Sequence, residues 1–265
     1  MSTNRILKTN EWQDLVKYKP WEVAKEISLP LPWFILEMWA AANQHKVLML
    51  FAAAYFFLTC LRVSHNAFHY CLGLSRTATD VVMLLLSVFM MTSMRATQVT
   101  HMQHHRHCLE ENDVEGYIAK LGFWNMLLQA PLFTLKLHKE ALSRSAKKSL
   151  KQNFWIKFEI ALNVFWMTAV WFWWDIDALK IHTVLMLLSH AISPMFTVWS
   201  VHHDCEDNTS DYDSRTLRSR WLSPLAYNML FHLEHHNYPA IPTCHLPQLA
   251  ERLDDAGLIN YKTVI

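Results

Sequence analysis

The chain has 265 residues with 24 Lys and Arg against 23 Asp and Glu, and its net charge of +1 gives no sign of a nucleic-acid partner. Apolar residues make up 52% of the sequence, which is rich for a soluble domain, and they are gathered in blocks separated by polar loops. The five cysteines form no CxxC pair and are odd in number, which argues against a disulfide scaffold or a thiolate zinc site.

Two apolar blocks follow the polar N-terminal residues. Residues 29–42 are apolar apart from Glu37, and residues 47–64 would be about 27 Å long as a helix, which nearly crosses a bilayer. A short polar break separates the blocks, so we expect a hairpin of two membrane-spanning helices. Its second arm leads directly into the motif HNAFH, which places His65 and His69 at i and i+4.

The next apolar run, 81–94, has fourteen residues, or about 21 Å of helix, which is short for a bilayer span. Histidine motifs lie on either side of it, HNAFH before and HMQHH after. If both motifs serve one site, the two ends of the run must lie on the same face of the membrane. We therefore predict that 81–94 does not cross the bilayer.

Three histidine motifs dominate the polar parts of the chain. The spacing HxxHH occurs in HMQHH and again in HLEHH, and on a helix such histidines share one face. Because each buried ring nitrogen needs a partner, several imidazoles on one face favour a metal ion over simple packing. The eight motif histidines are His65, His69, His101, His104, His105, His232, His235 and His236.

A second hydrophobic hairpin is expected from residues 154–174 and 178–201. With this topology, Lys46 and Lys180 are the only basic residues at the outer turns, so the positive-inside rule places every histidine motif on the cytoplasmic face. We predict an all-α integral membrane protein in which four transmembrane helices, in two hairpins, lie under a cytosolic cap that carries the histidine motifs. Residues 1–265 are expected to form this one domain.

The choice of metal does not follow from imidazole alone, which suits iron, zinc, copper or nickel. Zinc peptidase chemistry needs HExxH, and HNAFH lacks the Glu; the carboxylate di-iron plan of helical bundles needs Glu-x-x-His motifs, which are also missing. Eight or nine histidines exceed the four to six ligands of one ion, so two ions sharing them is the simplest interpretation.

HNAFH, HMQHH and FHLEHHNYP, in that order around two hydrophobic hairpins, resemble the membrane fatty acid desaturase–hydroxylase superfamily. The stretch RTLRSRWLSPLAYNMLFHLEHHNYPAIPTCHLPQL is similar to the short bacterial members of that family. The resemblance implies two irons in an all-histidine site and O₂ as co-substrate. It also implies desaturation or hydroxylation of an unactivated C–H in a fatty-acyl or lipid-like substrate. The electron donor would be a separate protein such as ferredoxin, rubredoxin or cytochrome b5.

The resemblance also implies a ninth histidine ligand between the last hairpin and the third motif, where the chain offers His202 and His203. Relatives often read Glu-His at this point, which predicts that His203 binds iron and that His202 lies behind the ligands. Three acids, Asp113, Glu115 and Glu234, could orient imidazoles from behind. For Asp113 and Glu115 an exposed position in the loop is an equally good interpretation. Asn228, one turn before His232, matches a family position near the metals.

Two alternatives stay open at this point. A carotenoid or small-metabolite oxygenase would carry the same di-iron site. A histidine-rich membrane metal transporter would need ligands near the bilayer midplane, whereas the motifs lie outside the apolar blocks. His182 and His190 do fall inside the last apolar block, and we expect them to be neutral and hydrogen-bonded to neighbouring helices.

Overall fold

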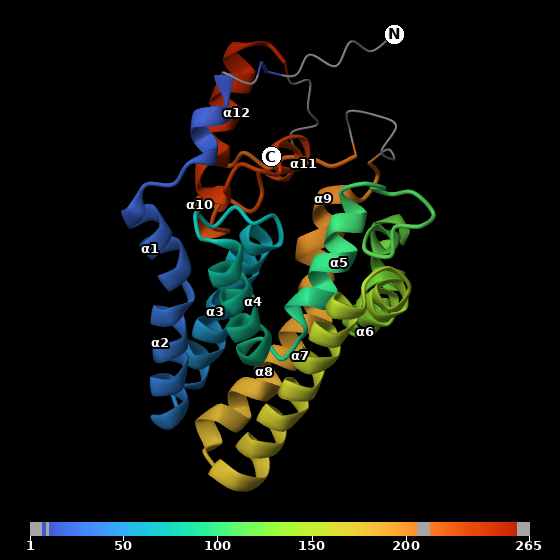
Figure 1. Cartoon of the computed structure of the whole chain (residues 1–265). Coiled ribbons are helices and arrows are strands. Elements are labelled where there is room, and N and C mark those ends of the chain that lie inside the picture. Colours follow the sequence, from blue (N-terminus) through green and yellow to red (C-terminus); the bar gives the residue numbers. More distant parts are fainter. Residues whose placement is uncertain (1–6, 9–10, 206–212, 259–265) are drawn as a thin grey trace.

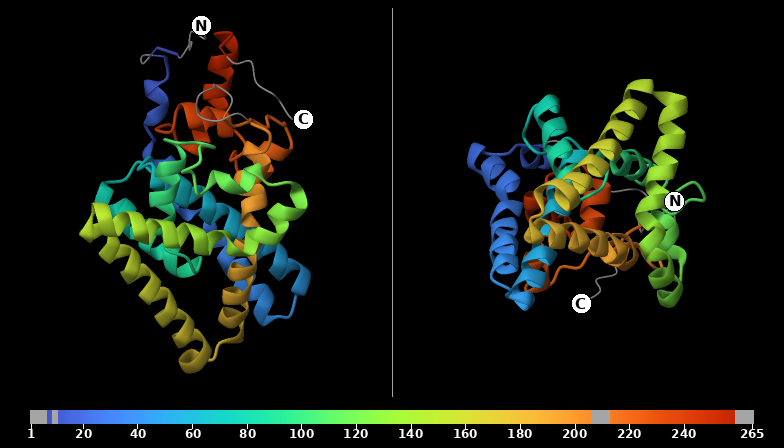
Figure 2. Two further views of the ribbon diagram at one scale, coloured as in Figure 1. Left: turned by 90° about the vertical axis from the view of Figure 1, so that its right-hand side faces the viewer. Right: turned by 90° about the horizontal axis from the view of Figure 1, so that it is seen from below.

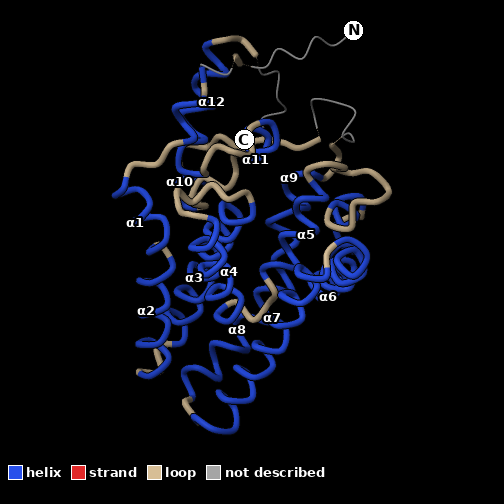
Figure 3. The backbone as a smooth tube through the Cα atoms, in the orientation of Figure 1, coloured by secondary structure: helices blue, strands red, loops and turns tan. Residues whose placement is uncertain are grey.

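The computed structural model of the protein describes residues 7–8, 11–205 and 213–258. The main helices are α1 (Pro20–Ser28), α2 (Pro30–Ala42), α3 (Lys46–Phe68), α4 (Arg76–Phe89), α5 (Met94–His104), α6 (Phe123–Lys148), α7 (Leu150–Thr168), α8 (Asp177–Pro194), α9 (Ser200–His202), α10 (Leu222–Leu225), α11 (His232–Asn237) and α12 (Leu246–Asp255). Within the described ranges the regular structure contains no strand (Figure 3), which confirms the all-α expectation. The hairpins α2–α3 and α7–α8 extend in one direction, and α10 to α12 lie at the opposite end (Figure 1).

The first hairpin packs α2 against α3. Gln44, in the left-handed conformation with φ 59°, turns the chain between them. Helix α3 has 23 residues and is about 35 Å long. It continues past residue 64, so His65 lies inside the helix and His69 is its C-cap. The first histidine motif is therefore held by the end of a rigid apolar helix.

Helices α4 and α5 form a bent pair between the first two histidine motifs. Ser75 and Ser93 cap their N-termini by accepting hydrogen bonds from backbone N–H groups one turn ahead. The two axes differ by 111°, so the chain turns back after α4. As a result His69, before the pair, and His101, near its end, lie with their Nε2 atoms 3.1 Å apart.

The second half of the helical region is built on the long amphipathic helix α6. Its buried positions recur at helical spacing and form one face: Met126, Ala130, Phe133, Leu137 and Ala141. Helix α6 crosses the open end of the V formed by α7 and α8 (Figure 2). Short π-helical stretches, Ala169–Trp174 and Met195–Trp199, follow α7 and α8, and the second of these leads into α9.

Among the described residues, two helical stretches are long and apolar enough to cross a membrane, Lys46–Phe68 and Asp177–His202, and the bent pair α4–α5 would be a third if it were one span. They correspond to the expected spans 47–64 and 178–201. The other two expected spans do not meet the same criterion. The expected span 29–42 corresponds to α2, which has 13 residues and is too short. The expected span 154–174 corresponds to α7 and the π-helical turn after it, and α7 carries three charged residues.

Two histidines within the last apolar block behave as expected. His182 lies between Glu37 Oε1 and the Phe89 carbonyl, 2.9 Å from each, and His190 Nε2 donates to the Met90 carbonyl at 2.6 Å. These contacts join α8 to α2 and to the end of α4. The prediction of hydrogen-bonded structural histidines is confirmed.

The C-terminal segment forms a cap over the helix ends. Its apolar core includes Phe231, Tyr238, Ile241 and Leu249, together with Leu15 from the N-terminal segment. This packing fixes the short helix α11, which carries the third histidine motif, above the ends of α3 and α5. The cap therefore supplies one motif, while the helical region supplies the other two.

Candidate metal centre

Nine imidazoles from four helices converge at the junction of the helical region and the cap. They come from the end of α3, from the C-terminal half of α5, from α9 and from α11. Ring contacts join them into one continuous cluster. The nine are His65, His69, His101, His104, His105, His202, His232, His235 and His236.

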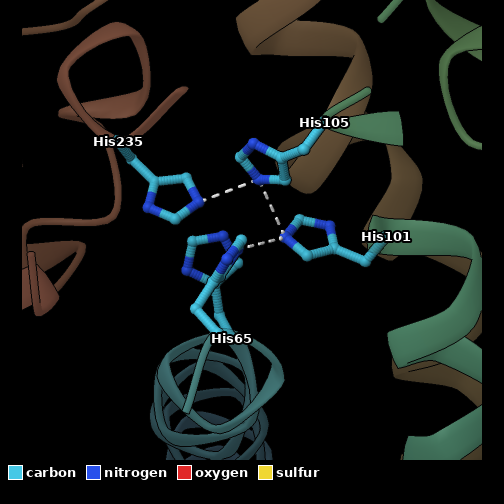
Figure 4. Close-up of side chains that lie close together, drawn as sticks. His65, His101, His105 and His235 are labelled. Atoms are coloured by element: carbon cyan, nitrogen blue, oxygen red, sulfur yellow. Dashed lines mark hydrogen bonds between the residues drawn. The ribbon is translucent and has the colours of Figure 1, made fainter. Parts of the chain in front are cut away.

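The first of two groups contains five histidines whose nearest ring nitrogens all lie within 4.8 Å of one another. Figure 4 shows four of them, from three different segments of the chain, with their rings directed at a common point. The Nε2 atom of His101 lies 3.1 Å from that of His69 and 3.2 Å from that of His105, and His105 Nε2 lies 3.0 Å from His235 Nε2. The group also contains His65, and Figure 4 labels every member except His69.

The second group contains His104, His202, His236 and the thiol of Cys108, again within 4.8 Å of one another. His202 Nε2 lies 3.1 Å from His104 Nε2 and 2.8 Å from that of His232, which makes His232 part of the same site. Burial raises the pKa of Cys108 to about 12, which favours the neutral thiol over the thiolate that binds metals. Imidazoles outnumber the single thiol in this group, so the histidines are the principal donors.

The structure reverses the expected placement of the two adjacent histidines after the last hairpin. His202 is fully inside the cluster, whereas His203 donates Nδ1 to the Ala119 carbonyl at 2.7 Å and stacks on Trp199. The reason is helical geometry: the His203 N–H still bonds to the Trp199 carbonyl, and adjacent helical residues point about 100° apart, so the two rings face different sides of the helix. The expectation that His203 faces the metals and His202 lies behind it is wrong in its geometry.

Two acids with little exposure to solvent contact cluster histidines at Nδ1, the ring nitrogen that faces away from the centre of the cluster. Asp113 Oδ2 lies 2.7 Å from His104 Nδ1, and Glu115 Oε1 lies 3.1 Å from His101 Nδ1. Backbone N–H groups of Glu115 and Gly116 donate to the other oxygen of Asp113, which fixes the carboxylate. Of the two interpretations left open for these acids, their contacts with His101 and His104 fit the orienting one, and neither is an exposed loop acid.

A third orienting residue, Asp213, was missed in the sequence. Its carbonyl accepts from His202 Nδ1 at 2.7 Å, and its carboxylate lies 3.3 Å from His236 Nδ1. It stands in a long polar loop with no histidine spacing around it, so no local pattern distinguishes it from its neighbours. Its role follows only from the fold.

The other two predicted residues lie elsewhere. Glu234 is fully buried and binds Arg218 at 2.6–2.7 Å, so its described partner is a cation in the cap. Burial raises the pKa of Glu234, and the charge of Arg218 opposes this. Asn228 does not precede His232 by a helical turn: it has φ 62° in a left-handed turn, and α11 begins only at His232.

The electrostatics of the cluster favour neutral, metal-binding imidazoles. Burial, reinforced by neighbouring imidazoles, holds the pKa of His105, His235 and His236 well below the ordinary value. Burial would raise the pKa of Asp113, but His104 and the backbone donors lower it to about 2, so this carboxylate stays charged. His104 is the exception among these imidazoles: burial lowers its pKa, but the charge of Asp113 and the hydrogen bond to it outweigh burial and raise the pKa well above the ordinary value. A carboxylate behind an imidazole is the usual outer partner of a metal-binding histidine.

The ring nitrogens provide a test of whether a metal fits. When Nδ1 donates outward, as in His202, Nε2 presents a lone pair inward, and two such atoms about 3 Å apart repel unless a proton or cation lies between them. Four buried ring nitrogens also lack any described hydrogen-bond partner: both of His65, Nδ1 of His235 and Nε2 of His236. An unpaired buried polar group costs roughly 1–3 kcal/mol. Metal ions would remove the repulsion between the inward-facing nitrogens, and would give His65 and His236 a partner for one ring nitrogen each.

These features define a helical protein with membrane-span candidates and a buried histidine cluster beneath a cap, with two groups of side chains that could hold metal ions. The sequence model of the fatty acid desaturase family matches residues 41–262, which is most of the chain, and the chain belongs to this family. No curated protein shows a significant match. Family membership confirms the resemblance to the membrane desaturase–hydroxylase superfamily.

Proposed function

We propose that the chain is a membrane-bound di-iron oxidoreductase that uses O₂ to desaturate or hydroxylate an unactivated C–H of a fatty-acyl or lipid-like substrate. The observation that carries this proposal is the convergence of nine imidazoles in two adjacent groups, within a member of the fatty acid desaturase family. Iron bound here would supply the one-electron and O₂ chemistry that protein side chains lack.

Each histidine group would hold one iron. The first would use the five histidines around His101, and the second would use His104, His202, His232 and His236. The protein's own contribution is orientation and exclusion of water. Asp113, Glu115 and Asp213 keep the Nδ1 protons directed outward, so that Nε2 is available to the metal.

The geometry of α4 and α5 supports a topology in which the site lies on one membrane face. Because His69 and His101 touch, the chain that leaves the site through α4 returns to it through α5. We infer that this pair does not span the bilayer, that α2 and α7 complete two spanning hairpins, and that the site is cytoplasmic. Cysteines introduced at Ser75 and Thr97 should be labelled from the same side; labelling from opposite sides would contradict the arrangement.

An apolar cavity supports a hydrophobic substrate. It has a volume of about 890 Å³, in the range of small-molecule sites, and lies between α6, α7 and α8 beside the α4–α5 turn. Its lining includes Met91, Leu135, Ile160 and Leu187. A separate electron carrier, such as a ferredoxin, rubredoxin or cytochrome b5, completes the proposed reaction.

Product analysis tests the proposal most directly. The full chain and a variant carrying His101→Ala would be produced in a lipid-rich host, and the lipids and carotenoids compared by mass spectrometry. Loss of about two mass units means desaturation, and gain of about sixteen means hydroxylation. We expect one of these on acyl chains, with about two irons per purified chain. A modified carotenoid or small metabolite would redirect the substrate class, and one zinc per active chain would contradict the proposal.

A further inference from the structure

A buried ionic network lies directly below the cluster, away from the imidazoles themselves. Arg62, one turn before His65 on α3, binds Glu26 of α1 through Nε at 2.8 Å and Nη2 at 2.6 Å. The two side chains are only 7% and 3% exposed. Asn66, next to His65, donates to the same carboxylate at 2.8 Å. Two residues that flank a cluster histidine are thus tied to one buried acid.

The third guanidinium nitrogen of Arg62 contacts the segment before the third histidine motif. Nη1 donates to the Tyr227 carbonyl at 2.6 Å. Tyr227 and Asn228 have φ 51° and 62°, a left-handed conformation that non-glycine residues rarely adopt and that needs support from its surroundings. Trp33 of α2 donates to the Tyr227 hydroxyl at 2.9 Å and supports the turn from a second side.

Asn66 reaches the segment after the third motif. Its Oδ1 accepts from the Thr243 hydroxyl at 2.7 Å and from the Thr243 backbone N–H at 3.2 Å. Both ends of the segment that carries α11 are therefore bound to α3, at Arg62, one turn before His65, and at Asn66, directly after it. This is notable because α11 has only six residues and cannot fix its own position by length.

We infer that Glu26, Arg62 and Asn66 are positioning residues that set the third histidine motif against the first. This inference rests on the proposed metal centre. Arg62 fixes three acceptor atoms at once because its guanidinium is a planar fork, and lysine, with one ammonium group, cannot reproduce that geometry. Asn66 serves as both donor and acceptor, so it joins α1 and the cap through one side chain.

The test is a Co²⁺ titration of the purified full chain in detergent, against a competing chelator, with the visible spectrum recorded. Arg62→Lys should weaken Co²⁺ binding by about 10–100-fold and alter the spectrum, as expected for loss of a residue that orients ligands. Arg252→Lys is the matched control. Arg252 forms a similar two-pronged pair with Asp14, and its described partners, Glu11 and Asp14, lie outside the three histidine motifs. It should bind Co²⁺ like the wild type.

If Arg62→Lys does not fold, two smaller changes at Thr243 test the same inference. Thr243→Val keeps the shape but removes the hydroxyl donor, and Thr243→Ser keeps the donor. We expect weaker binding and a changed spectrum for the valine variant and wild-type behaviour for the serine variant. Wild-type affinity and spectrum in both folded Arg62→Lys and Thr243→Val would overturn the inference. A wild-type chain that binds no Co²⁺ would instead overturn the proposed metal centre, and the inference with it.

Discussion

The two histidine groups differ in what lies behind their ring nitrogens. In the second group His104 and His236 direct Nδ1 at the carboxylates of Asp113 and Asp213, and His202 directs Nδ1 at the backbone carbonyl of Asp213. In the first group, among the described residues, His101 alone has a carboxylate partner, and the other four contact mainly one another. The second group is therefore oriented by acids, and the first by mutual packing of imidazoles.

This difference predicts how each group depends on its surroundings. Acids behind the second group fix the direction of its donors before a metal arrives, which lowers the cost of binding. In the first group, both ring nitrogens of His65 lack a described partner, so no protein group orients this ring, and a metal would supply a partner for one of the two nitrogens. We expect changes in the outer acids to weaken the second site and leave the first largely intact.

The largest effect is expected from removing one histidine of each group. His65→Ala and His202→Ala should each lower bound iron from about two to about one per chain and abolish turnover, because each removes a donor atom. Iron content and product formation measure the effect.

His203→Ala is the matched control for His202→Ala. It should keep its iron, because the His203 ring lies on Trp199 and binds the Ala119 carbonyl. An iron-free His203→Ala variant beside an iron-loaded His202→Ala variant would show that the metal-bound protein places the pair the other way round.

Replacing the acid behind His104 should have the next largest effect. Asp113→Asn removes the negative charge opposite His104 and should lower metal affinity at the second group by about 10–100-fold. A two-phase metal titration would show one weakened and one unchanged step. Glu110→Gln is the control, because Glu110 binds the partly exposed His107 outside the cluster. Equal weakening of both steps would break the distinction between the groups.

A glycine near this acid offers a subtler change. A methyl group added at Gly116 would overlap the Asp113 carboxylate, so Gly116→Ala should displace that side chain from His104. We expect up to about tenfold weaker binding at the second group, at the lower end of effects from outer partners. Gly122→Ala meets no atom within 4 Å and serves as control. Identical metal titrations for the two variants would contradict the proposed role of Asp113.

The smallest effect concerns pH and lies outside both groups. The pKa of His245 is raised from 6.5 to about 9. The largest cause is a hydrogen bond with Cys244; hydrogen bonds with Leu15 and Glu22 also raise the pKa, and burial opposes them. A raised folded-state pKa stabilises the fold fully below pH 6.5, and this stabilisation is lost as pH rises through about 9.

Thermal unfolding should show this loss as a Tm lower by a few degrees, on the order of 2–8 °C, above pH 9 than below pH 6.5. The variant His245→Gln should show a weaker dependence over this range. His107→Gln, at a partly exposed histidine, should retain the wild-type dependence. A pH dependence that His245→Gln leaves unchanged would assign the effect to other groups.

The sequence by itself determined the helical class and eight of the nine clustered histidines. Apolar runs define helices such as α3 because apolar side chains must leave water, and the spacing HxxHH places imidazoles on one helical face. These are local properties, so short stretches of sequence contain them. The structural, hydrogen-bonded state of His182 and His190 also followed from their place inside an apolar block.

Only the tertiary structure decided which residues complete the site. The choice between His202 and His203 depends on which side of α9 faces the cluster, and the role of Asp213 depends on its contacts with His202 and His236. Asn228 lies in a left-handed turn that Arg62 and Trp33 support from distant helices. These features arise from contacts between residues far apart in the chain, and no local spacing contains that information.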